Sequence, residues 1–205
     1  MKYLKTYQLF EAKAGLTPEQ EEFLNKYTKG TWTLNPATGL VDVKGGFDCS
    51  YEKKLEDFKG VTFGKVSGDF YCQRNQLTSL EGAPQEVGGD FDCKDNNLTS
   101  LAGAPQEMGG RFWCDEFELK KVEWNLEGWL NVLEEGSPKA QKLILTILSP
   151  EELNKEIEKD PAGMIMKLKG VWNDENLKET RSKLVWPKGY EEEADLLGDL
   201  DDVGF

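Results

Sequence analysis

A motif that recurs every 21 residues constrains the fold of this chain more than any other feature. Segments 68–72, 89–93 and 110–114 read GDFYC, GDFDC and GRFWC, and the first two are each followed by the sequences LTSL and GAPQE. A looser copy, GFDC at 46–49, lies 23 residues before the first of these. Repeats of this length are typical of leucine-rich repeats, in which each turn of a solenoid contributes one short strand. We therefore expect a short solenoid of about four parallel strands.

The alternation within each repeat predicts which side chains are buried. Successive residues of a strand point to opposite faces, so Phe91 and Cys93 are expected to point into the solenoid and their neighbours outward. Asn96 is expected to bond free backbone groups of the turn that leaves the strand. The other inward positions of this repeat are Leu98, Leu101, Ala104 and Met108.

The segments on either side of the repeats predict caps for the two ends of the solenoid. Residues 17–20 read TPEQ, a capping box that predicts a helix running to about Tyr27 and stopping at Gly30. Segments 31–34 and 40–43 alternate around the turn sequence NPATG, which predicts a β-hairpin. After residue 115 the apolar spacing becomes helical. Helix starts are predicted at Ser137, Ser149, Asp160 and Asn173-Asp174.

The chain is therefore interpreted as an α+β protein with four parts. They are an N-terminal leader and helix (1–30), a hairpin cap with a leucine-rich-repeat-like solenoid (31–122), a C-terminal helical cap (123–189) and an acidic tail (190–205).

The composition excludes several classes of function. With 25 basic and 38 acidic residues the net charge is −13, so we expect no nucleic-acid partner. No apolar stretch approaches the roughly 20 residues of a membrane span, and no secretory signal peptide is present, so we expect no membrane partner and a cytoplasmic location. The absence of histidine excludes Ser-His-Asp triads and histidine-ligated metals.

The four cysteines are expected to be buried thiols. Cys49, Cys72, Cys93 and Cys114 recur at one position of the repeat, so they form a column across neighbouring strands. Strands lie about 4.8 Å apart, and a column of four spans about 14 Å, which is too long for the ligands of one zinc ion. We therefore assign no metal site, no cofactor and no catalytic residue, and expect that the protein is not an enzyme.

The outward strand positions form the candidate partner-binding site. They combine carboxylates with two aromatic residues, Tyr71 and Trp113, and these aromatic types are favoured anchors of protein interfaces. The alternative is an ordinary solvated sheet face. This concave strip consists of Asp48, Asp69, Tyr71, Gln73, Asp90, Asp92, Lys94, Arg111, Trp113 and Asp115.

The repeat units resemble leucine-rich-repeat-like proteins of large tailed bacteriophages, in which similar GDFxC units are strung together. The resemblance covers about residues 31–122 and implies a viral origin and a solenoid fold, but no established activity. Similar short repeats occur in secreted bacterial ubiquitin-ligase effectors, whose ligase domain follows the repeats and uses a cysteine. This chain has no cysteine after Cys114, which argues against that activity.

A second resemblance lies at the N-terminus, where residues 5–12 read KTYQLFEA. This segment resembles the capsid-targeting peptide of T-even-type phage internal proteins, although four residues precede Lys5 and the glutamate follows Phe10 sooner than in that family. The resemblance implies packaging with a phage capsid or scaffold as partner, and a location in the host cytoplasm or virion interior. The alternative is an ordinary amphipathic leader helix.

The same resemblance predicts proteolytic processing between Glu11 and Ala12. Co-expression with the cognate prohead protease should give a product that begins at Ala12, and Glu11→Gln should block cleavage because the protease would lose the carboxylate it recognises. Mass spectrometry of the product measures its N-terminus. Virion-derived protein that retains Met1 would contradict the prediction.

Three classes of function follow from these observations. The first is a non-enzymatic protein–protein interaction module that binds an unidentified partner through the concave strand face. The second is an internal virion protein packaged through the cleaved N-terminal peptide. The third is an enzyme activity in the C-terminal helices, which no sequence motif supports.

Overall fold

A computed structural model describes residues 15–115, 117–120 and 123–190, together with residues 192, 194 and 197. The candidate processing residues Glu11 and Ala12 and most of the acidic tail lie outside the described residues. The chain divides into two compact units, 1–121 and 122–205, and each is described by itself. No helix in the described part of the chain is long and apolar enough to cross a membrane.

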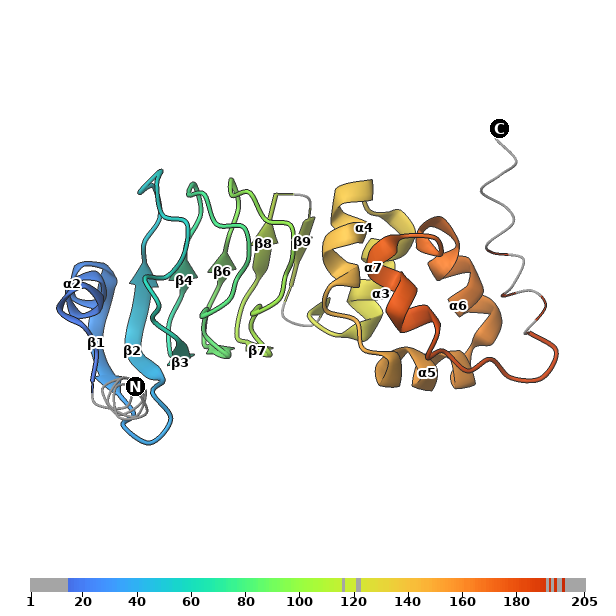
Figure 1. Cartoon of the computed structure of the whole chain (residues 1–205), viewed down its shortest axis with the longest axis horizontal. Coiled ribbons are helices and arrows are strands. Elements are labelled where there is room, and N and C mark those ends of the chain that lie inside the picture. Colours follow the sequence, from blue (N-terminus) through green and yellow to red (C-terminus); the bar gives the residue numbers. More distant parts are fainter. Residues whose placement is uncertain are drawn as a thin grey trace, which may run out of the picture. The chain divides into compact units, whose positions relative to one another are not determined.

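The first unit opens with a helix and a β-hairpin (Figure 1). Helix α2 (Pro18–Tyr27) has the predicted capping box at Thr17, and strands β1 (Thr28–Leu34) and β2 (Val41–Asp48) pair antiparallel. The expectation that Gly30 ends the helix is wrong, because β1 follows Tyr27 directly and Gly30 lies inside it, opposite Gly45. Both glycines have positive φ values, and a Cβ on either would overlap a carbonyl oxygen of the paired strand.

The repeats form a solenoid of about three turns whose strands are mostly parallel (Figure 1). The four motif segments lie on neighbouring parallel strands, with Phe47, Phe70, Phe91 and Phe112 in register. Each turn contributes two short strands rather than the one predicted. These strands are β3 (Phe63–Val66), β4 (Phe70–Tyr71), β5 (Glu86–Val87), β6 (Phe91–Asp92), β7 (Glu107–Met108) and β8 (Phe112–Cys114), followed by β9 (Phe117–Leu119), which is antiparallel to β8.

Paired small residues explain why each turn has two strands. Gly88 and Gly89 separate β5 from β6, and both donate backbone hydrogen bonds to the preceding turn, so the ladder continues through the bend. A Cβ on Gly88 would overlap the carbonyl oxygen of Ser67, and a Cβ on Gly109 would overlap that of Gly88. The turns therefore approach one another more closely at this bend than side chains would allow.

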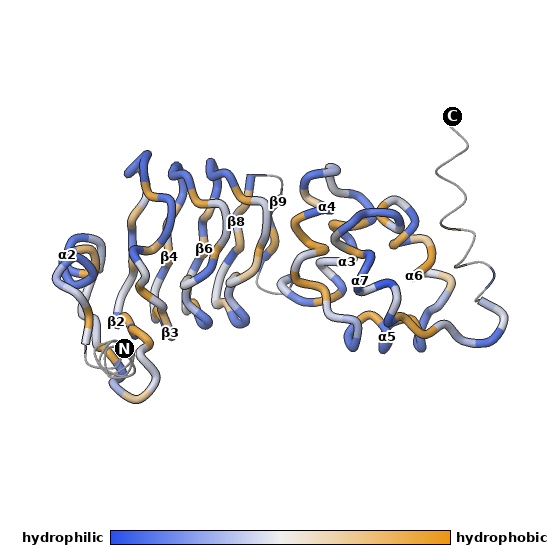
Figure 2. The backbone as a smooth tube through the Cα atoms, in the orientation of Figure 1, coloured by the Kyte–Doolittle hydropathy of each residue, from blue (hydrophilic) through white to orange (hydrophobic). Residues whose placement is uncertain are grey.

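A column of phenylalanine rings fills the solenoid. Phe47, Phe70, Phe91 and Phe112 stack with successive centroids 5.3, 5.3 and 5.4 Å apart and with planes within 14° of parallel. All four rings are fully buried, and the four cysteines are buried beside them and form no disulfide, as predicted. The expectation for Ala104 was wrong, because this residue is only half-buried. Hydrophilic residues gather in the turns at the ends of the strands (Figure 2).

A ladder of two buried asparagines closes the turns that follow strands β4 and β6. Asn96 Nδ2 donates to the carbonyl oxygens of Cys72 and Cys93 at 3.0 and 2.9 Å, and its Oδ1 accepts from Leu77 N at 3.1 Å. Asn75 Nδ2 makes the equivalent bonds to Cys49 and Cys72. The predicted role of the asparagine position is therefore confirmed.

The second unit is helical, and three of its helices begin at predicted caps. Ser137 and Ser149 cap α4 and α5, the latter with a full capping box, and Asp160 caps α6. Ala194 and Leu197, the buried residues described in the tail segment, lie in this unit. The elements are α3 (Leu126–Glu135), α4 (Pro138–Leu145), α5 (Pro150–Lys159), α6 (Pro161–Leu168), the short 3-10 helix η2 (Lys169–Val171) and α7 (Glu175–Arg181).

Candidate partner-binding surface

The register of the parallel strands places the predicted site residues on one face of the solenoid, which we call the strand face. Asp48 pairs with Tyr71, Tyr71 with Asp92, and Asp92 with Trp113, so these four form a central row across β2, β4, β6 and β8. The other residues of the predicted strip flank this row, two positions before or after it along each strand. The strip is therefore a continuous surface within the first unit.

Two carboxylates of the strip support the fold directly. Asp69 Oδ1 accepts from Asp90 N at 2.8 Å, and Asp90 Oδ1 accepts from Arg111 N at 2.7 Å. Each side chain thus extends the backbone ladder by one bond to the next turn. Both oxygens of Asp69 and one oxygen of Asp90 therefore accept hydrogen bonds within the unit, and the partner-binding role of these residues stays a prediction.

The carboxylates at the strand ends are also engaged locally. Asp48 Oδ1 accepts from both the backbone and the hydroxyl of Ser50, and Asp92 Oδ1 accepts from Lys94 N at 3.0 Å. Asp115 Oδ1 accepts from Asp95 N in the preceding turn. These side chains satisfy amides that the short strands leave unpaired, which is the usual behaviour of aspartate next to a turn.

Asp92 points outward from the sheet as the alternation predicts, but it is buried. It lies on the strand face but is only 8% exposed, because Tyr71 and Trp113 hold the positions on either side of it. Burial raises the pKa of its carboxyl group. A carboxylate in this position is costly to desolvate, so a cation close to it is strongly favoured.

The two predicted aromatic anchors are half-buried rather than exposed. The Tyr71 hydroxyl donates to Asp69 Oδ2 at 3.2 Å. Burial and the neighbouring Asp69 carboxylate raise the pKa of Tyr71 to about 12, so the hydroxyl remains a donor at neutral pH. Trp113 carries two cations over its ring: Lys94 Nζ lies 5.1 Å and Arg111 Cζ lies 5.7 Å from the ring centroid.

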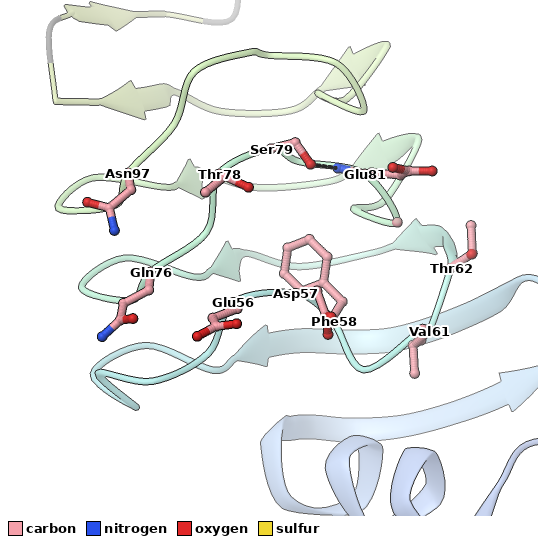
Figure 3. Close-up of a pocket in the computed structure, with 12 residues that line it drawn as sticks. Glu56, Asp57, Phe58, Val61, Thr62, Gln76, Thr78, Ser79, Glu81 and Asn97 are labelled. Atoms are coloured by element: carbon pink, nitrogen blue, oxygen red, sulfur yellow. Dashed lines mark hydrogen bonds between the residues drawn. The ribbon is translucent and has the colours of Figure 1, made fainter.

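Sequence reasoning missed a hollow of about 640 Å³ formed by the segments that return from one motif strand to the next turn (Figure 3). Its signal in the sequence was the irregular first repeat, which supplies Glu56, Asp57 and the buried ring of Phe58. No lysine or arginine lines the hollow. The lining is completed by Gly60, Val61, Thr62, Gln76, Thr78, Ser79, Glu81, Gly82 and Asn97.

Thiol chemistry is suppressed in the first unit. Burial raises the pKa of Cys72 and Cys93 well above the ordinary value, so neither thiol ionises at neutral pH. Among the described residues no group of three or more cysteine, aspartate or glutamate side chains could hold a metal ion. Comparison with protein-family models, with curated proteins and with solved structures found no match for this chain.

Proposed function

We propose that the protein is a non-enzymatic binding module that holds a protein partner against its strand face. One observation carries this proposal: a buried carboxylate, Asp92, lies between two half-buried aromatic side chains, Tyr71 and Trp113, on consecutive strands. Aromatic side chains around a desolvated polar centre are typical of the energetic core of a protein interface. A rigid parallel sheet presents them without loss of backbone entropy.

The wider interpretation of the repeat unit belongs to the same proposal. We propose that the unit is leucine-rich-repeat-like and of phage origin. The 21-residue period, the parallel solenoid and the buried asparagine ladder support the first part, and the likeness of its GDFxC units to phage proteins supports the second.

The binding proposal is tested by comparing what variants of the full chain retain from a lysate of the cells in which the protein is made. A specific partner should be retained by the wild type and lost by Tyr71→Ala/Trp113→Ala, because truncation of an interface anchor costs about 1–3 kcal/mol. The matched control is Glu56→Gln/Glu81→Gln, which alters the hollow on the return segments and should bind normally. Circular dichroism verifies that each variant is folded. A partner that is lost with the hollow variant but kept by the aromatic variant would contradict the proposal.

A further inference from the structure

Two side-chain oxygen atoms on the strand face have no hydrogen-bond donor among the described residues. Asp92 Oδ1 accepts from Lys94 N, but the nearest cationic atom to Asp92 Oδ2 is Lys94 Nζ at 3.9 Å, which is too far for a hydrogen bond. The Gln73 side-chain oxygen is also buried without a partner among the described residues. Gln73 belongs to the turn next to Asp92 and occupies the repeat position equivalent to Lys94. Buried acceptors without donors are rare in folded proteins.

The side chains around Asp92 favour a cation. Tyr71 and Trp113 lie on the strands on either side, about 4.8 Å from Asp92 in the direction of the stack. Trp113 already accepts two cations on its ring, so its position suits cation–π contacts. Of these cations, Arg111 is paired with Glu118 at 3.5 Å. The Lys94 side chain is 45% exposed, and its ammonium lies near Asp92 Oδ2 and the Trp113 ring.

We propose that this arrangement is a binding subsite for the guanidinium group of an arginine in the partner, and that the Lys94 ammonium is an internal placeholder which the arginine displaces. The inference rests on the proposed function and specifies the chemistry of the partner. A guanidinium group is planar and carries five donors, so it can donate to Asp92 Oδ2 while it stacks on Trp113. An ammonium group is a compact point charge, and the Lys94 ammonium lies 3.9 Å from Asp92 Oδ2, beyond hydrogen-bond distance.

The subsite can be tested on the full chain without knowing the partner. The probes are N-acetyl-arginine amide and N-acetyl-citrulline amide, which have nearly the same shape but differ in charge. The signal is the Trp113 indole N–H resonance of ¹⁵N-labelled protein, assigned with Trp113→Phe. We expect a saturable shift with the arginine probe and none with the citrulline probe.

Two variants test the role of the Asp92 carboxylate and the role of the Lys94 ammonium separately. Asp92→Asn keeps the acceptor for Lys94 N but removes the charge, and it should abolish the shift. Lys94→Met removes the competing ammonium while keeping the aliphatic stem, and it should tighten arginine binding about threefold, in line with a weak exposed cation–π contact. Glu81→Gln and Lys65→Met make the same changes in charge away from the strand face, and both should leave the affinity unchanged.

The outcomes of these experiments distinguish failure of the arginine subsite from failure of the proposed function. An equal shift with the citrulline probe, or Lys94→Met protein that binds arginine no more tightly than the wild type, would overturn it. If the partner is lost by Tyr71→Ala/Trp113→Ala but bound normally by Asp92→Asn, the arginine subsite is wrong while the proposed function stands. If neither variant affects the partner, both are wrong.

Discussion

Replacement of Phe91 by alanine should lower the free energy of unfolding of the first unit by about 3–5 kcal/mol. Phe91 is fully buried in the middle of the phenylalanine column, with Phe70 and Phe112 stacked on its two faces at 5.3 and 5.4 Å. Truncation removes both ring contacts. The resulting cavity cannot collapse, because the backbone ladder fixes the distance between turns.

Thiol labelling in denaturant measures this effect within the full chain. All four cysteines lie in the first unit and are buried, so their reaction with a bulky thiol reagent reports the unfolding of that unit alone. Tyr51→Ala is the matched control. Tyr51 is 55% exposed, and the guanidinium group of Arg74 lies over the face of its ring. The control should lose at most about 1 kcal/mol. Equal losses for the two variants would contradict the stacked core.

Substitution of Asn96 by aspartate should cost about 3–5 kcal/mol, the usual penalty for an uncompensated buried charge. The side chain is 8% exposed, and its amide nitrogen donates to the carbonyl oxygens of Cys72 and Cys93. A carboxylate has no donor for these oxygens and would repel them. The loss should diminish as the pH falls, because the introduced group is tolerated better when it is protonated.

The neighbouring residue provides the matched control for this prediction. Asn97 is exposed, and its backbone N–H, which the substitution retains, bonds the Leu77 carbonyl oxygen. Asn97→Asp therefore introduces the same charge one position away and should change the free energy of unfolding by no more than about 0.5 kcal/mol. The same thiol-labelling assay applies to both variants. Similar effects at the two positions would show that the asparagine ladder does not stabilise the turns.

The repeat itself explains why the first unit could be predicted so far. An exact 21-residue period fixes the register, so the positions of Phe91, Cys93 and Asn96 follow from one alignment. The second strand of each turn was not predicted, because Glu86-Val87 is too short to show an alternating pattern. Its position depends on hydrogen bonds to the equivalent residues of the neighbouring turns.

The sequence predicts which residues share the face of the candidate site, but it does not predict their hydrogen bonds or their burial. Alternation places Asp69, Asp90 and Asp92 outward, yet it does not reveal that Asp69 and Asp90 bond backbone amides of the next turn. The burial of Asp92 is a property of its neighbours on other strands, 21 residues away in each direction. The hollow on the return segments depends on the first repeat, which departs from the periodic pattern.

The most direct measurement of the central claim is the affinity of the captured partner for three forms of the full chain. The wild type, Tyr71→Ala/Trp113→Ala and a chain lacking residues 190–205 can be compared by titration calorimetry. If the strand face binds the partner, the aromatic double variant should bind at least about 30-fold more weakly, which corresponds to about 2 kcal/mol, and the truncated chain should bind normally. Full affinity of the double variant together with loss of binding by the truncated chain would show that the partner docks on the acidic tail instead.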